Sequence, residues 1–124
     1  MVSIAKTSAG APCKPSIPTF ATPSANVGYI LFNDHTRVAE PDLISAFEVL
    51  EAASATELIL DLRYNTGGFL FIANRVAYMI AGNAADGKVF EKLSFNNRFP
   101  TINPITGATN NPILFESTGN KTVG

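Results

Sequence analysis

Cysteine and histidine are scarce in this chain of 124 residues, which contains one of each. The single cysteine, Cys13, excludes an internal disulfide and a cysteine-based metal cluster, and we interpret it as an incidental thiol in a loop. His35 follows Asn33 and Asp34 in a polar stretch, and we interpret it as a loop histidine rather than a catalytic one. Because the usual ligand spacings are missing, we expect no metal and no other cofactor.

Charged residues are also few, at 15% of the chain, and nine basic residues nearly balance ten acidic ones. The chain therefore lacks the excess of positive charge with which proteins bind nucleic acids or anionic membranes, and we expect neither as a partner. No apolar run approaches the ~18 to 20 residues that a membrane-spanning helix needs. Residues 1–14 lack the charged start and apolar stretch of a signal peptide, so we expect a soluble chain.

Apolar residues make up 46% of the chain, which fits one domain with one core. Residues 1–26 contain four prolines, and this density predicts an extended arm that is not a core element. Residues 27–95 are predicted to form an α/β core. Residues 96–124 are rich in Asn, Thr, Pro and Gly and predict a long functional or mobile loop followed by an incomplete C-terminal segment.

Three strands are predicted within the core. Residues 27–32 (VGYILF) and 57–62 (ELILDL) are short, continuous apolar runs of the kind that form strands buried on both faces. Residues 88–95 alternate imperfectly between apolar and polar side chains, which predicts a third strand nearer a sheet edge.

Two helices are predicted between these strands. The first starts near Pro41 and Asp42, which suit the first turn of a helix, and a second over residues 69–81 is stopped by Gly82. Their apolar sides comprise Leu43, Ile44, Phe47 and Leu50 in the first and Ile72, Val76, Met79 and Ile80 in the second. The order strand, helix, strand, helix, strand predicts an α/β layer with mainly parallel strands and right-handed crossovers.

The stretch DLRYNTGG, residues 61–68, joins the second strand to the second helix. In an open parallel sheet, ligands bind beyond the carboxyl ends of the strands, which is where this stretch lies. The adjacent Gly67 and Gly68 allow a tight turn and leave amides unpaired at a helix N-terminus. From residue types alone, the turn could bind a phosphate, stabilise an oxyanion, or only need glycine for its backbone. The phosphate interpretation is weak because neither the Walker nor the dinucleotide glycine pattern is present.

LILDLRYNTGG, together with VGYILFN upstream, resembles the hallmark of the tail-specific or C-terminal processing serine peptidases. The resemblance covers residues 27–95, and Thr66 departs from it because the family more often has Pro or Gly there. It implies part of a ClpP/crotonase-like peptidase core that acts on a peptide or protein substrate. It also implies that the Gly68 amide, with Gly67 as second candidate, binds the oxyanion, and that Asp61 and Arg63 support the corner structurally.

The resemblance further implies a nucleophilic serine in a small-residue stretch and an activating lysine beyond it. Neither is found in that context in this chain. Ser117 and Lys121 are the only late pair of these types, but they lie in a Gly- and Asn-rich tail, and we do not interpret them as a dyad. A serine needs a base within hydrogen-bond reach to become a useful nucleophile, so we expect the chain alone to be inactive.

Two functions follow from the sequence. The first is the N-terminal part of a Ser-Lys peptidase core that supplies the oxyanion corner but not the nucleophile. The alternative is a non-catalytic module that binds a peptide, or a second copy of the chain, through exposed sheet edges. The family is commonly exported in bacteria, so the resemblance implies a periplasmic or cell-surface parent protein, although the sequence shows no export signal.

Overall fold

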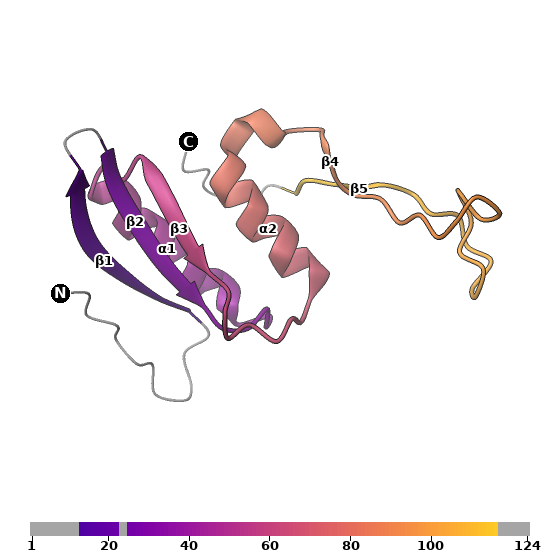
Figure 1. The fold of residues 1–124 in the computed structure, drawn as a ribbon, viewed down its shortest axis with the longest axis horizontal. Helices are drawn as coiled ribbons and strands as arrows, with labels where there is room; N and C mark the ends of the chain where they lie inside the picture. The colour runs from indigo at the N-terminus through magenta and orange to yellow at the C-terminus, as the bar shows by residue number, and fades with distance from the viewer. Residues whose placement is uncertain (1–12, 23–24, 117–124) are drawn as a thin grey trace.

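The computed structural model describes residues 13–22 and 25–116. Figure 1 shows the order of the elements: β1 (Cys13–Thr22), β2 (Ala25–Phe32), α1 (Ala39–Ala52), β3 (Glu57–Asp61), α2 (Leu70–Ala81), the 3-10 helix η1 (Gly82–Ala85), β4 (Val89–Glu91) and β5 (Ile113–Leu114). This alternation of strands and helices confirms the predicted α/β class. Within the described ranges, no helix is long and apolar enough to span a membrane.

The main sheet has three strands in the order β1-β2-β3. β2 and β3 are parallel and are joined by α1, with Ile30 opposite Leu60 and Leu31 opposite Asp61. Because the two strands are parallel, their carboxyl ends lie at the same end of the sheet, and the chain leaves both strands there.

β1 differs from the predicted arm, because residues 13–22 pair with β2 in antiparallel orientation. Proline has no backbone N–H for a ladder, but a strand at a sheet edge tolerates it. The pairing register of β1 also shifts between Ser16 and Phe20, on either side of Pro18. The proline density that indicated an arm is therefore compatible with an edge strand.

Both helices pack against one face of this sheet. Ile30 and Phe32 of β2 point to that face and are fully buried. The predicted apolar sides of the helices are confirmed by the buried residues Leu43, Phe47, Leu50, Ile72, Val76 and Met79. A side-chain carbon at Gly28 would lie 2.7 Å from Leu50, so the glycine lets α1 approach β2 closely.

Two burial predictions are wrong. Ile80, predicted on the apolar side of α2, is 48% exposed, whereas Asn74 and Tyr78 are buried. Ile59 in β3 is 47% exposed, so this strand is not buried on both faces. The helices cover a single face, and among the described residues β3 pairs with β2 alone, so β3 is an edge strand.

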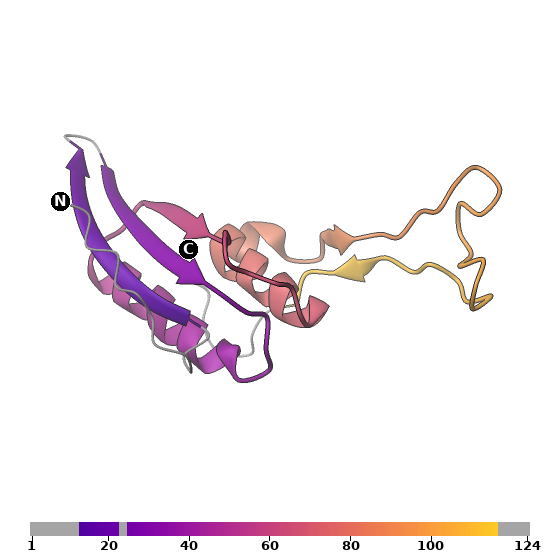
Figure 2. The same cartoon turned by 60° about the horizontal axis from the view of Figure 1, so that its bottom comes forward.

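β4 and β5 form a separate two-stranded antiparallel sheet. The strand predicted over residues 88–95 is thus shorter than expected and does not join the main sheet. The segment between β4 and β5 forms a long hairpin that extends away from the sheet and helices, as Figure 2 shows.

Candidate functional site

The loop between β3 and α2 lies beside the loop that follows β2. The backbone N–H of His35 donates to the carbonyl of Gly67 at 3.0 Å, and the N–H of Phe69 donates to the carbonyl of His35 at 2.8 Å. These bonds continue the parallel pairing of β2 and β3 beyond the strands, with His35 opposite Gly68. The predicted loop histidine therefore lies at the glycine corner, which we define as residues 65–69 together with His35.

The two glycines of the corner have different surroundings. Gly68 has a φ of +134°, and a side-chain carbon there would lie 2.5 Å from the carbonyl oxygen of His35. Gly67 has a φ of +100°, but a side-chain carbon there would meet nothing within 4 Å. Gly68 is thus required by both backbone conformation and space, and Gly67 by backbone conformation alone.

The backbone amides of the two glycines also differ. The Gly67 N–H donates to Oδ1 of Asn65 at 2.8 Å, so this amide already has an acceptor. The Gly68 N–H has no acceptor among the described residues. It lies just before Phe69, the N-cap of α2, which has no side-chain cap of its own. The positive end of the helix dipole therefore lies next to an amide that is available to a ligand.

Asn65 connects the corner to the end of β2. Its Nδ2 donates to the Phe32 carbonyl at 3.0 Å, and its Oδ1 lies 2.8 Å from Nδ1 of His35. Because the Phe32 carbonyl only accepts and the Gly67 amide only donates, the orientation of the Asn65 amide is determined. Oδ1 accepts only, so Nδ1 of His35 is the donor. No role for Asn65 was predicted from the sequence, and His35 was predicted to lie in a loop. The signal in the sequence was that both residues follow the ends of strands predicted to be parallel.

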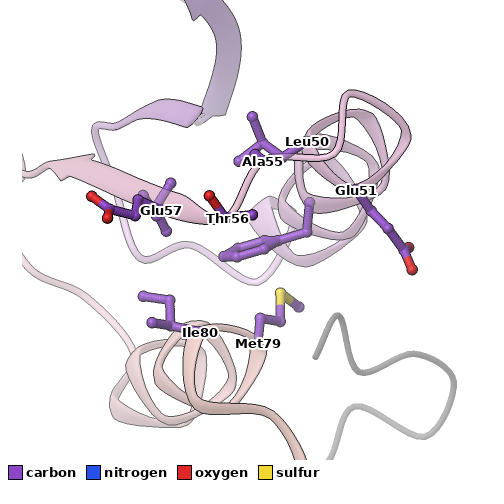
Figure 3. Close-up of a pocket in the computed structure, with 9 residues that line it drawn as sticks. Leu50, Glu51, Ala55, Thr56, Glu57, Met79 and Ile80 are labelled. Carbon is purple, nitrogen blue, oxygen red and sulfur yellow. The ribbon is translucent and has the colours of Figure 1, made fainter. Parts of the chain in front are cut away.

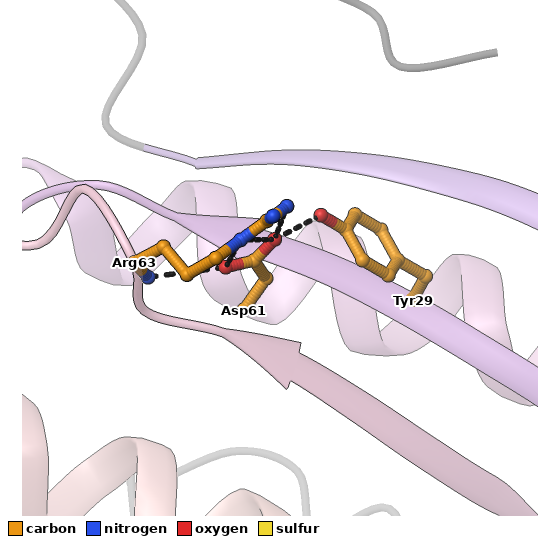
Figure 4. Close-up of polar contacts among 3 residues, drawn as sticks. All are labelled: Tyr29, Asp61 and Arg63. Atoms are coloured by element: carbon orange, nitrogen blue, oxygen red, sulfur yellow. Dashed lines mark hydrogen bonds and ion pairs between the residues drawn. The ribbon is translucent and has the colours of Figure 1, made fainter. Parts of the chain in front are cut away.

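Asp61, Arg63 and Tyr29 form a polar network at the end of β3 (Figure 4). Asp61 is 7% exposed. Arg63 donates from Nε to both carboxylate oxygens at 3.0 Å and from Nη2 to Oδ2 at 2.6 Å. The Arg63 amide donates to Oδ1 at 3.0 Å, and the Tyr29 hydroxyl to Oδ2 at 2.5 Å. Every one of these bonds leads to the same carboxylate.

This network keeps Asp61 ionised. The side-chain hydrogen bond from Arg63, then that from Tyr29 and then the Arg63 amide lower the pKa of Asp61 below its ordinary 3.8. The hydrogen bond to Asp61 raises the pKa of Tyr29, and the same carboxylate raises the pKa of Arg63. A carboxyl group with a depressed pKa does not act as a general acid at neutral pH, so the geometry fits support of the loop better than proton transfer.

Two arginines flank the first turn of α2. The Arg37 guanidinium lies 4.6 Å from the ring centre of Phe69 and 5.3 Å from that of Phe71. Arg75 lies 5.2 Å from the Phe71 ring and forms an ion pair with Glu40. The Arg37 contacts hold the start of α2 against the loop after β2, whereas the ion pair of Arg75 with Glu40 connects α2 to α1.

A pocket of about 330 Å³ lies at the other end of β3, away from the glycine corner. Figure 3 shows it between the two helices and the start of β3. Its lining residues are Phe47, Leu50, Glu51, Ala55, Thr56, Glu57, Leu58, Met79 and Ile80.

Within the described part of the chain, no group of His, Cys, Asp or Glu could hold a metal ion. Ser117 and Lys121 lie outside the described residues.

In a comparison with known families, the profile described as peptidase family S41 matches residues 26–103. The matched region includes β2 except for Ala25, the whole of β3, both helices and the whole glycine corner. It confirms the family resemblance drawn from the sequence motif. Searches of curated proteins and of solved structures found no match.

Proposed function

Because this chain belongs to peptidase family S41, a family of serine peptidases, we propose that it forms the N-terminal part of the catalytic core of a C-terminal processing endopeptidase. In this proposal the Gly68 amide is a donor of the oxyanion hole. The observation that supports it is an amide without an acceptor among the described residues, at the start of α2. Gly67 is not proposed as a second donor because its amide donates to Asn65.

The proposed chemistry needs groups that we place downstream of Gly124. A serine hydroxyl attacks the substrate carbonyl while a lysine amine accepts its proton, and the carbonyl oxygen becomes negatively charged. The Gly68 N–H donates to that oxygen. Removing one such donor typically lowers kcat by about 10²- to 10³-fold, because a preorganised donor needs no rearrangement during the reaction. The Asp61–Arg63 pair supports the loop that carries Gly68.

NMR tests the role of the Gly68 amide directly. The protein extended by the residues encoded after Gly124 is labelled with ¹⁵N-glycine and treated with a peptide boronate, which forms a tetrahedral adduct with a nucleophilic serine. We expect the Gly68 amide proton to shift strongly downfield and the Gly67 amide, which donates to Asn65, to shift little. An adduct that leaves Gly68 unshifted would contradict the proposal. The 124-residue chain alone is expected not to hydrolyse peptides.

A second candidate function is supported by the edge of β3. Among the described residues this strand pairs with β2 alone, and Ile59 and Leu62 are exposed there. An unpaired edge with apolar side chains can add a strand from a peptide or from a second copy of the chain. As a binding or self-associating module, the chain would dimerise in sedimentation equilibrium, and Ile59→Lys would weaken the dimer. A strictly monomeric chain at high concentration that binds no peptide would exclude this candidate.

A further inference from the structure

We propose that Asn65 and His35 are positioning residues of the glycine corner, which together hold the Gly68 amide turned outward. The catalytic meaning of this inference rests on the proposed function. Its structural part concerns one peptide plane and does not depend on which function the chain has.

The peptide group between Gly67 and Gly68 is held by a hydrogen bond at its carbonyl, and its N–H has no acceptor among the described residues. A trans peptide is planar, and its carbonyl and N–H point in opposite directions. The Gly67 carbonyl accepts a hydrogen bond from the His35 amide at 3.0 Å. The Gly68 N–H in the same plane must therefore point away from His35, toward the side where no described residue accepts it.

Asn65 holds the neighbouring peptide plane, between Thr66 and Gly67. Its Oδ1 accepts from the Gly67 amide at 2.8 Å, which limits the rotation of the peptide plane that follows. A carbonyl oxygen has two lone pairs, and the second accepts from Nδ1 of His35 at 2.8 Å. Nδ2 of Asn65 is bound to the Phe32 carbonyl at the end of β2. One side chain thus links the turn, the histidine and the sheet.

His35 completes the arrangement with its ring. The ring contacts Phe32 edge-on, with centres 4.5 Å apart, and Nδ1 donates to Asn65. An asparagine at position 35 can place an amide donor where Nδ1 lies, whereas a phenylalanine keeps the ring and removes the donor. His35→Asn and His35→Phe therefore separate the hydrogen bond from the packing.

Amide hydrogen exchange on the chain itself tests the structural part. In the wild type we expect slow exchange at Gly67 and fast exchange at Gly68. Asn65→Ala should speed exchange at Gly67 roughly tenfold, the loss expected for one hydrogen bond. Asn96→Ala, which removes a similar turn asparagine in the exposed hairpin, should leave Gly67 unchanged. Unchanged exchange at Gly67 in folded Asn65→Ala would overturn the inference.

Kinetics of the protein extended beyond Gly124 test the catalytic part. Asn65→Ala and His35→Phe should lower kcat about tenfold or more with little change in KM, because they misplace a donor used in the transition state. His35→Asn should restore most of kcat. Equal losses in His35→Asn and His35→Phe would overturn the role of Nδ1. If the wild-type boronate adduct leaves Gly68 unshifted, the proposed function fails, whereas an equal shift in wild type and Asn65→Ala defeats only this inference.

Discussion

At the scale of single residues, the two adjacent glycines of the corner differ in how much space a side chain would have. Both have a positive φ, which costs another residue roughly 1–3 kcal/mol. Gly68→Ala adds a contact at 2.5 Å with the His35 carbonyl oxygen, whereas Gly67→Ala adds no contact within 4 Å. We expect Gly68→Ala to lower the free energy of unfolding more, as measured by urea denaturation. Equal losses in the two variants would mean that the loop carrying Gly68 can move away from His35 at no cost in stability.

Asp61 gives the folded chain a pH-dependent stability. Its pKa is lower in the folded state than its ordinary 3.8, so the unfolded chain takes up a proton first as the pH falls. The stabilisation is therefore complete above about pH 5 and is lost progressively as the pH falls below that value. We expect Tm to fall more steeply between about pH 5 and pH 3 in the wild type than in Asp61→Asn. Parallel curves would show that the carboxylate is not stabilised by Arg63 and Tyr29.

Much of the site could be predicted from its motif, but not which amide is available. Gly68, Gly67, Asp61 and Arg63 all lie in one stretch of sequence, and their positions follow from its resemblance to a family. The role of His35 depends on a pairing across 33 residues with Gly68, which becomes visible only once β2 and β3 are known to be parallel. The occupied Gly67 amide depends on a side-chain orientation that the sequence does not specify.

At the scale of elements, Asn74 joins α2 to the end of β5 and to the residues that follow it. It is 1% exposed, and its amide donates to the Leu114 carbonyl at 2.7 Å and accepts from the Glu116 amide at 3.1 Å. Asn74→Ala leaves both backbone groups without partners, so we expect a loss of about 1–3 kcal/mol in the free energy of unfolding. Asn96 also accepts from backbone amides but is exposed, and Asn96→Ala should cost less. A similar loss in both variants would contradict this account.

Helices were easier to predict than strands. The helical stripes follow from local periodicity, and α1 and α2 begin within two residues of their predicted starts. Strand burial depends on partners that are distant in sequence. β1 was not predicted as a strand because of its prolines. β3 is half-exposed because the helices cover only one face of the sheet. β4 pairs with β5 and not with a strand of the main sheet.

At the scale of the whole molecule, the described chain combines a packed body with a projecting hairpin. The body contains the core, the glycine corner and most of the region matched to the peptidase family. The hairpin has no buried apolar side chain between β4 and β5, and Ile105 near its tip is 87% exposed. The match ends at residue 103, so the returning half of the hairpin lies outside it.

The isolation of the hairpin makes it a target for limited proteolysis. Arg98 is the only lysine or arginine between residues 93 and 120, and it is exposed, so we expect trypsin to cleave the hairpin of the native chain there. The two pieces should still co-elute in gel filtration, because Asn74 and the pairing of β4 with β5 hold the second piece to the first. They should part only in denaturant. Spontaneous release of the smaller piece would show that the anchorage is weaker than its buried bonds imply.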